Sequence, residues 1–483
     1  MKILWIPQIS SKSADGYILL NKDSNISFLL NMVESENFVS NDILVAFEFS
    51  REKCIGVEVV EKYFDVVFNS SRVFTNAKME RFNFDSEYFE QIKNQYGNFD
   101  VVFTNEPTKV QPLKVIFSES KICCYNHWLA CKNMPDLSLR QFEGMKAADI
   151  CFVNSAYTIQ EILKYYSEFE GAQDVKLVKL QPSFSGDIKP LKQYDSEKQF
   201  AIIYNHRLSS DPYYANAFKS LLSICDEVEK YVDNMPIVYF TNPSGKQIDV
   251  ESYKPYFKQI NLESKENYND FLASNVLVHL NTFFTSEGMW SMSTVDCAIN
   301  GNICLLPNKY GYAEIFSKNY YGYCATESQM ADKLVNLIKG ISKAEWYLDN
   351  YVKNHSGKSI GDKLVAILEN DEIIGCNRPW GSYEILEKSP KRVVKRLTIL
   401  PHSRLSRQVH KFKTEKWVVI SGTPDVYIGS KEYGLCPGDM ITIPAGKEHY
   451  IQSYGKVIII EESTSNTIVS ESDIVRITDI YGR

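Results

Sequence analysis

Short, continuous runs of apolar residues recur along the first two thirds of the chain, and stretches with the apolar spacing of helices separate them. Such runs are typical of strands that are buried on both faces, as in parallel sheets covered by helices. One group of runs covers residues 2–6, 43–47, 101–104, 121–125 and 150–153, and a second covers 200–204, 237–240, 276–280 and 303–306. The restart of the pattern predicts two doubly wound α/β domains in tandem.

The pattern changes in residues 376–483. Apolar and polar positions alternate there, for example in Trp417–Ile420 and Met440–Ile443. A period of two predicts strands that turn every second side chain inward. We therefore expect β-hairpins that close into one small all-β barrel.

A chain of 483 residues is too long for a single core and predicts about three domains. Polar, turn-rich stretches mark the boundaries, around Pro182–Asp187 with the polar run to Lys198, and around Glu369–Glu372. The expected domains are 1–190, 198–368 and 372–483.

Four polar residues of the barrel segment fall at positions that the alternation turns toward its interior, namely Gln408, His410, Glu415 and His449. Two imidazoles, a carboxylate and an amide oxygen suit zinc, manganese, iron or nickel, and leave coordination positions open for a substrate. The residue types do not distinguish among these metals. We therefore predict a divalent transition-metal centre.

Further motifs surround this set: Arg378–Tyr383, Val394–Arg396, Leu405–Gln408 and Asp473–Arg483. Together they resemble the C-terminal cupin domain of type II mannose-6-phosphate isomerases over the whole of that domain. The resemblance implies that a metal polarises the sugar carbonyl and hydroxyl during aldose–ketose interconversion. Matched residue by residue, it gives Gln408, His410, Glu415 and His449 as ligands, and Lys395, Arg476 and Arg483 as phosphate-binding or catalytic residues.

Four positions depart from that family. Phe412 and Lys413 replace a second histidine and an arginine, Tyr450 replaces an arginine, and Ser453 replaces an asparagine. The ligand set is kept while the sugar-phosphate pocket changes. A metal-binding barrel with altered or lost catalysis is one expectation, and a barrel kept for docking or for a homodimer is the alternative.

The second α/β domain carries its own motifs. No GxGxxG follows the first strand and no GxxxxGK[ST] occurs, so dinucleotide and P-loop sites lose their usual support. Instead, Asn205-His206-Arg207 follows the first strand of the second domain, and Ser286–Asp296 leads into Gly301–Leu306. These segments resemble the donor domain of GT-B glycosyltransferases, in particular the retaining class with a Glu-x7-Glu motif. The resemblance implies two Rossmann-like domains (GT-B) ahead of the cupin barrel.

This resemblance implies a nucleotide-sugar site. Arg207 would bind the diphosphate beside free backbone N–H groups, and Asp296 would accept from the ribose hydroxyls. Glu287 and Gly288 would lie near the sugar or the phosphates. In the first domain, His127 would contact the sugar or the acceptor as a catalytic residue.

Here too the sequence departs from the family. The spacing from Glu287 to Asp296 is one residue longer, aspartate replaces the second glutamate, and Pro212 replaces a lysine. Simpler roles compete with the functional ones. Arg207 can cap a helix or pair with an acid, His127 can be a satisfied core histidine, and Glu287 can be a solvated residue at a helix start.

The first functional hypothesis is a nucleotide-sugar-dependent glycosyltransferase with a fused isomerase-like cupin. Its acceptor is a glycan or a modified nucleobase, for example a hydroxymethylated DNA base or an RNA base, and neither is preferred. A net charge of −7 gives no general attraction to nucleic acid. A local group of Lys12, Lys109, Lys114 and Lys132 would still offer phosphate contacts.

Two other classes remain open. One is a sugar-phosphate isomerase of the mannose-6-phosphate type with a sugar-nucleotide-binding N-terminal module. The other is a non-enzymatic protein whose cupin binds sugar or mediates dimerisation. No apolar run reaches the length of a membrane span or of a signal peptide, and the eleven cysteines form no paired motif. We therefore expect a cytoplasmic protein with free thiols.

Overall fold

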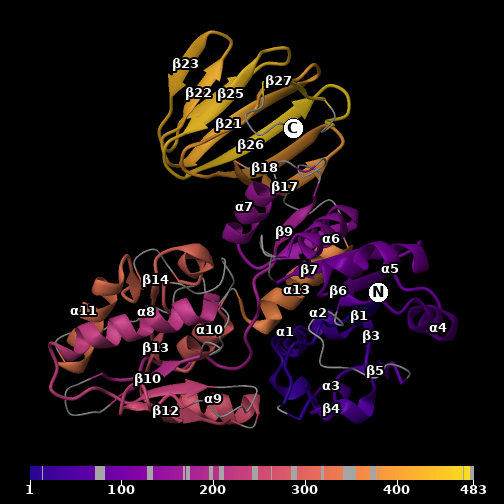
Figure 1. Ribbon diagram of the computed structural model, residues 1–483. Coiled ribbons are helices and arrows are strands. Elements are labelled where there is room, and N and C mark those ends of the chain that lie inside the picture. The colour runs from indigo at the N-terminus through magenta and orange to yellow at the C-terminus, as the bar shows by residue number, and fades with distance from the viewer. Residues whose placement is uncertain are drawn as a thin grey trace. The chain divides into compact units, whose positions relative to one another are not determined.

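The computed structural model describes most of the chain (Figure 1). The described residues are 1–13, 15–70, 82–127, 134–166, 169, 175–194, 200–205, 212–241, 249–262, 264–283, 291–316, 320–340, 355–369, 377–378, 380–470 and 473–478. They form two compact units, of which one comprises Met1–Glu161 and Lys179–Val365 and the other comprises Ile162–Val178 and Ala366–Arg483. The boundaries of the three domains expected from the sequence stay a prediction.

The first unit contains two parallel sheets, except for residues 177 and 178 at the end of the first sheet, which belong to the second unit. The first has the order β5 (Asp65–Phe68), β3 (Asp42–Phe47), β1 (Lys2–Ile6), β6 (Val101–Thr104), β7 (Lys121–Asn126), β8 (Ile150–Val153) and β9 (Leu177–Lys179). Consecutive residues of β1, from Ile3 to Trp5, are fully buried. Side chains of both faces are therefore covered, as the continuous apolar runs predict.

The second sheet repeats this topology. Its order is β12 (Phe257–Ile260), β11 (Val238–Thr241), β10 (Ala201–Tyr204), β13 (Leu277–Leu280), β14 (Ile303–Pro307) and β15 (Tyr323–Cys324). In both sheets the chain starts at an inner strand, moves to one edge and then returns to build the other side. The strand order thus reverses beside β1 in the first sheet and beside β10 in the second, which is where ligands bind in open α/β sheets.

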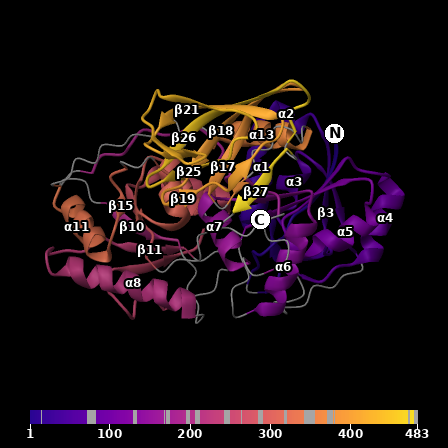
Figure 2. The same cartoon turned by 90° about the horizontal axis from the view of Figure 1, so that it is seen from above.

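Helices connect the parallel strands. Those before the second sheet are α1 (Ser24–Asn31), α2 (Glu36–Val39), α3 (Glu58–Glu61), α4 (Ser86–Tyr96), α5 (Val110–Ile116), α6 (Pro135–Ala147) and α7 (Ala156–Tyr165). Those that follow are α8 (Pro212–Glu229), α9 (Lys265–Ser274), α10 (Met292–Ile299), α11 (Glu327–Ile338) and α13 (Gly357–Glu369). Helices α8 and α11 pack side by side (Figures 1 and 2).

Polar side chains fix where several helices begin. The Asp85 carboxylate accepts the N–H of Tyr88 at the start of α4. Ser291 accepts the N–H of Thr294 at the start of α10 in the same way. Such caps satisfy backbone donors that have no partner inside the helix.

Helix α13 follows the second sheet in sequence but packs against the first α/β segment. Asp362 accepts hydrogen bonds from Ser35 Oγ at 2.7 Å and from Asn37 Nδ2 at 2.9 Å. Gly357 lies so close that a Cβ there would come within 1.7 Å of the Asn31 carbonyl oxygen. The glycine therefore permits a direct backbone contact between α13 and α1.

The second unit contains two antiparallel sheets. One has the order β16 (Asn377–Arg378), β17 (Gly381–Ser389), β18 (Arg392–Ile399), β26 (Val457–Ser465), β21 (Lys413–Ser421) and β24 (Met440–Ile443). The other has the order β23 (Lys431–Gly434), β22 (Asp425–Ile428), β25 (His449–Ser453), β20 (Arg407–Val409) and β27 (Val475–Thr478), with β19 (Ser403–Arg404) on β25. Trp417, Val426, Ile451 and Ile459 belong to the buried core between them.

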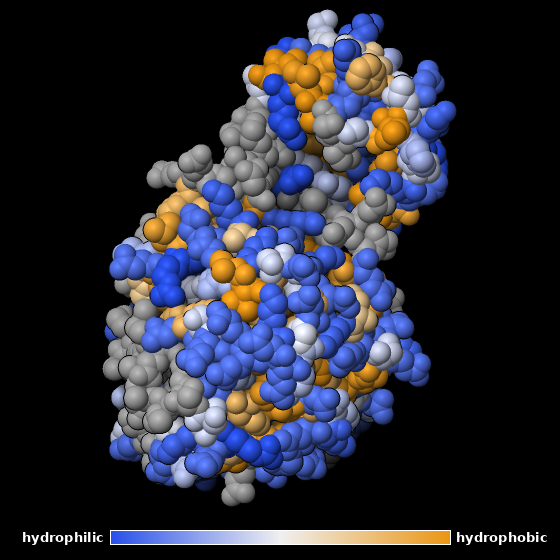
Figure 3. Space-filling view, turned by 90° about the vertical axis from the view of Figure 1, so that its right-hand side faces the viewer, coloured by the Kyte–Doolittle hydropathy of each residue, from blue (hydrophilic) through white to orange (hydrophobic). Residues whose placement is uncertain are grey.

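The surface seen in Figure 3 is mostly hydrophilic, with apolar residues in small groups. Among the described residues, none of the helices combines the length and apolar character that crossing a bilayer requires. The cysteines within the described ranges are free thiols, as expected, and most of them are buried.

Candidate metal centre

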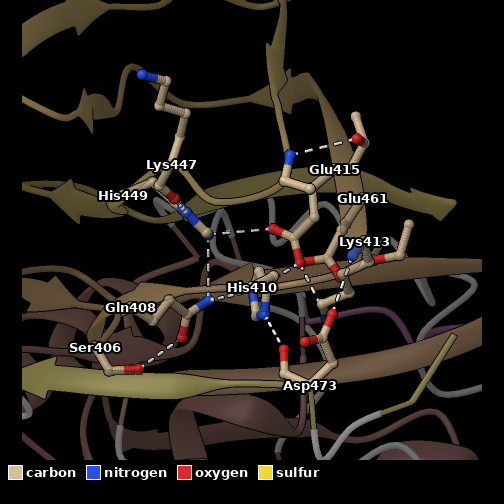
Figure 4. Close-up of polar contacts among 12 residues, drawn as sticks. Ser406, Gln408, His410, Lys413, Glu415, Lys447, His449, Glu461 and Asp473 are labelled. Carbon is tan, nitrogen blue, oxygen red and sulfur yellow. Dashed lines mark hydrogen bonds and ion pairs between the residues drawn. The ribbon is translucent and has the colours of Figure 1, made fainter. Parts of the chain in front are cut away.

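The predicted ligands come from both sheets of the barrel (Figure 4). Gln408 lies on β20 and pairs in register with His449 at the start of β25. His410 follows β20, while Glu415 lies on β21 in the other sheet. The expected β-hairpins are therefore wrong in detail, because β20 pairs with β25 and β21 pairs with β24, so the site spans two sheets.

The side chains nevertheless converge as predicted. His410 Nε2 lies 3.0 Å from Glu415 Oε1, and His449 Nε2 lies 3.3 Å from Glu415 Oε2. One ligand atom from each of the three residues lies within 4.8 Å of the others, and all three residues are buried. The inward alternation along β21 and β25 is the reason for this geometry.

Each imidazole is oriented by a backbone carbonyl. His410 Nδ1 lies at hydrogen-bond distance from the carbonyl oxygen of Asp473, and His449 Nδ1 lies 3.0 Å from that of Lys447. A carbonyl oxygen only accepts, so each Nδ1 carries a proton and donates it. In a neutral ring the Nε2 lone pair then faces Glu415, which is the tautomer that a metal-binding histidine needs.

The carboxylate of Glu415 is under strong electrostatic influence. Burial raises its pKa, but the close contacts with His410 and His449 and the charge of Lys413 outweigh burial and hold the pKa well below the usual range. Burial lowers the pKa of His449, yet contact with Glu415 raises it overall. Glu415 therefore stays ionised and attracts positive charge.

The donor set fits a divalent cation. Glu415 Oε2 is buried, and within the described residues its contact with His449 lacks hydrogen-bond geometry. Two imidazole lone pairs and an ionised carboxylate that face one another require protons or a cation between them. Two nitrogens and a carboxylate match zinc or another divalent transition metal.

Gln408 completes the set in a different orientation. Its Nε2 lies 3.3 Å from His410 Nε2 and 3.4 Å from His449 Nε2, while its Oε1 accepts from Ser406 Oγ at 2.8 Å. The amide oxygen and nitrogen are interchangeable by rotation about the last side-chain bond. After that rotation the oxygen faces the cluster, and the Ser406 hydroxyl accepts from the amide nitrogen.

Asp473 holds the turn between His410 and β21. Its carboxylate accepts the backbone N–H groups of Lys411 at 2.9 Å, Phe412 at 2.9 Å and Lys413 at 3.0 Å. Partial burial raises the pKa of Asp473, but these hydrogen bonds lower it overall. Asp473 opens the family-like segment Asp473–Arg483, but the resemblance did not predict this role for it.

Two of the three predicted phosphate-binding residues lie on strands of different sheets. Lys395 of β18 is buried in the barrel, 3.8 Å from Glu461 Oε1 and over the ring of Tyr383. Arg476 of β27 pairs in register with Gln408 and is exposed. Arg483 lies outside the described residues. Glu461, which partners Lys395, was not predicted, because only cross-strand register reveals it.

His127 lies just beyond the carboxyl end of β7. Its Nε2 is 3.0 Å from Asn105 Nδ2, and its ring stacks on Tyr125 with centroids 4.1 Å apart. Burial lowers the pKa of His127 to about 3, so the ring is neutral near pH 7. These contacts agree with the packed core histidine that was the simpler alternative, and a catalytic role stays a prediction.

The predicted donor-site residues are described only in part. Arg207, Glu287 and Gly288 lie outside the described residues. Asp296 of α10 is buried, and its carboxylate pairs with Lys265 at the start of α9. A ribose contact by Asp296 would therefore share this carboxylate with Lys265.

Two lysines of the predicted basic patch pair with acidic side chains. Lys109 is buried and forms an ion pair with Glu48. Lys114 pairs with Asp149 at 3.1 Å, and Lys132 lies outside the described residues. The prediction that Lys109 offers a phosphate contact is wrong, because its charge is neutralised inside the fold.

Comparison with known proteins shows which family the barrel segment is similar to. Residues 369–479 match the family model of the mannose-6-phosphate isomerase C-terminal domain. A mannose-1-phosphate guanylyltransferase of Klebsiella pneumoniae is 35% identical over 107 residues, which is 22% of this chain and 23% of the relative. The alginate biosynthesis protein AlgA of Pseudomonas aeruginosa is 37% identical over 107 residues, which is 22% of each chain.

A mannose-1-phosphate guanylyltransferase of Salmonella montevideo is 28% identical over 213 residues, 43% of this chain and 44% of the relative. The chain thus spans less than half of the length of these curated relatives.

Among solved structures, an uncharacterised double-stranded β-helix protein of Klebsiella pneumoniae is 18% identical, covers 20% of this chain and 83% of its own, and has a TM-score of 0.18. A cupin-superfamily sugar phosphate isomerase of Silicibacter pomeroyi is 20% identical, covers 18% and 59%, and has a TM-score of 0.17. The family model and the curated relatives carry the comparison: residues 369–479 match the mannose-6-phosphate isomerase C-terminal domain, and parts of the chain are similar to mannose-1-phosphate guanylyltransferases.

Proposed function

We propose that the barrel is a metal-dependent domain that binds a sugar phosphate and interconverts aldose and ketose forms, as in mannose-6-phosphate isomerases. The observation that carries the proposal is the buried convergence of His410, Glu415 and His449 with both histidines oriented by carbonyls. A divalent cation held by these residues and Gln408 would supply Lewis acidity toward the sugar oxygens.

The chain's own residues supply the remaining chemistry of the proposal. Lys395 and Glu461 face each other inside the barrel at 3.8 Å, and Ser463 Oγ donates to Glu461 Oε1 at 3.2 Å. Such a pair can give and take a proton during the interconversion. Arg476 is exposed on β27, beside Gln408, and is the basic residue that we assign to the phosphate.

Metal content tests this proposal. Purified protein should contain a stoichiometric transition metal by elemental analysis, and His410→Ala combined with His449→Ala should abolish it. His402→Asn is the matched control, because His402 is an exposed histidine of the same unit. Unchanged metal in the double variant would defeat the ligand assignment. Mannose 6-phosphate turnover that survives Lys395→Met would remove Lys395 from the reaction.

For the α/β unit we propose a transferase of nucleotide-sugar metabolism. Two parallel sheets that each have a strand-order reversal offer ligand-binding edges that a glycosyl transfer from a nucleotide sugar could use, and the return of α13 to the first segment agrees with a GT-B enzyme. A glycan and a nucleobase both remain proposed acceptors. The guanylyltransferase relatives favour nucleotidyl transfer to a sugar phosphate instead.

Product analysis separates the two transferase reactions. Nucleotidyl transfer from GTP to mannose 1-phosphate releases pyrophosphate, whereas glycosyl transfer releases a nucleoside diphosphate from a nucleotide sugar. In the glycosyl-transfer proposal Arg207 binds the donor diphosphate. Loss of such a charge-assisted contact costs on the order of 2–3 kcal/mol. Arg207→Ala should then weaken donor binding by roughly thirty- to one-hundred-fold, and equal affinities in calorimetry would exclude Arg207.

A further inference from the structure

One residue in the metal centre carries a positive charge of its own. Lys413 begins β21, two positions before Glu415, so both side chains point into the barrel. Lys413 is 5% exposed, and its Nζ lies 3.0 Å from Glu415 Oε1. The same carboxylate oxygen lies 3.0 Å from His410 Nε2. A buried ammonium and a ligand histidine therefore share one oxygen of the ligand carboxylate.

The backbone of Lys413 is held at two points. The N–H of Lys413 donates to the Asp473 carboxylate at 3.0 Å, and Lys413 pairs in register with Ser465 of β26. Figure 4 shows the side chain beside Glu415, within the group of predicted ligands. The lysine is thus anchored at the wall of the site.

The charge balance follows from these contacts. Glu415 contributes one negative charge and Lys413 contributes one positive charge, so these two buried side chains balance each other without a metal. A divalent cation that binds Glu415 must sit near the ammonium, and like charges repel strongly where water is excluded.

We propose that Lys413 is an internal cation that competes with the metal for Glu415 and sets the metal affinity of this barrel. This inference rests on the proposed metal site. Without metal the barrel keeps the buried Lys413–Glu415 ion pair, and it takes up metal only at a higher free concentration than it would without this charge.

The test compares two substitutions on one strand. Lys413→Met removes the buried charge with little change in length, and Lys416→Met removes the charge of a lysine that is not buried, one residue beyond Glu415 on β21. After chelator treatment, each full-length protein is titrated with Zn²⁺ and with Mn²⁺ against a competing chelator. We expect Lys413→Met to bind at least roughly tenfold more tightly than wild type, and Lys416→Met to bind like wild type.

Thermal unfolding supplies a second readout. Without metal, Lys413→Met should melt below wild type, because Glu415 loses a buried partner. With metal, its melting temperature should rise by more than that of wild type. Lys413→Arg keeps the charge and should keep the weaker affinity, and Lys413→Gln replaces Lys413→Met if the latter does not fold.

The outcomes separate the two proposals. Equal affinities of wild type, Lys413→Met and Lys413→Gln would overturn the role of Lys413 while leaving the metal site intact. A complete lack of binding by wild type and by all variants would overturn the metal site itself, and the competition with it.

Discussion

The Asp473 carboxylate accepts the backbone N–H groups of residues 411–413, and we call these three hydrogen bonds the Asp473 clamp. The clamp allows a local and quantitative prediction. Asp473→Ala keeps the backbone carbonyl that orients His410 but removes the carboxylate that accepts three consecutive N–H groups. The turn from Lys411 to Lys413 then loses its only charged acceptor among these contacts. We expect this turn to open more often while the rest of the barrel stays folded.

The magnitude follows from the contacts. A hydrogen bond to a charged group contributes about 1.5–3 kcal/mol, but Asp473 is only partly buried and water replaces part of the loss. We therefore expect a total of about 2 kcal/mol rather than the sum of three bonds. At about 1.4 kcal/mol per decade, this is a roughly thirtyfold increase in opening.

Amide hydrogen exchange measures this opening directly. In protein treated with a chelator, the protection factors of the amides of residues 411–413 should be roughly thirtyfold lower in Asp473→Ala than in wild type. Asp439→Ala is the control, because Asp439 accepts the Cys436 N–H at 2.8 Å in another turn. Full protection of residues 411–413 in Asp473→Ala would refute the clamp.

The same clamp should depend on pH. The folded-state pKa of Asp473 is lowered, so its contribution to stability is complete above the unfolded value of 3.8 and is lost as the pH falls below it. Exchange corrected for its intrinsic pH dependence should therefore show the clamp weakening only in acid.

Three further predictions concern the first unit and the separability of the parts. Burial lowers the pKa of His355 to about 3 from 6.5, so the unfolded state takes up a proton first and stability falls as the pH drops from 6.5 toward 3. Urea unfolding should show a smaller loss between pH 7 and pH 5 in His355→Gln, and an identical loss would assign the effect to other groups. Gly357→Ala should destabilise the packing of α13 by roughly 1–3 kcal/mol, because the new methyl group meets the Asn31 carbonyl, and an unchanged melting temperature would contradict that contact. Residues 1–369 should keep nucleotide release and residues 372–483 should keep metal, and a folded but inactive transferase fragment would show that the barrel belongs to its site.

The inner strands of both parallel sheets could be predicted from the sequence, whereas several edge strands could not. Strands β1, β3, β10 and β14 coincide closely with continuous apolar runs, because both of their faces are buried. In contrast, β12 contains Lys258 and Gln259, and its burial is partial. Only pairing with β11 defines it as a strand, and no local pattern reveals that pairing.

The convergence of His410, Glu415 and His449 could be predicted because their spacing and the inward alternation are local properties. The contacts that orient them are not local. Asp473 reaches His410 across 63 positions of the chain, and Glu461 meets Lys395 only through the pairing of β18 with β26. Lys413 was recognised as a departure from the family, but its contact with Glu415 depends on the rotamers inside the barrel.

The dependence of His410 on Asp473 also bears on how the barrel matures. During synthesis His410, Glu415 and His449 leave the ribosome before Asp473 does, so for a time the imidazole of His410 has no carbonyl to orient it. The turn after His410 lacks its clamp during the same interval. A nascent chain therefore exposes the predicted ligand residues without the arranged site. Capture of the proposed metal would then follow the docking of the segment ahead of β27. Prematurely terminated chains that end before Asp473 would carry all the ligands yet hold metal poorly, which distinguishes finished barrels from unfinished ones.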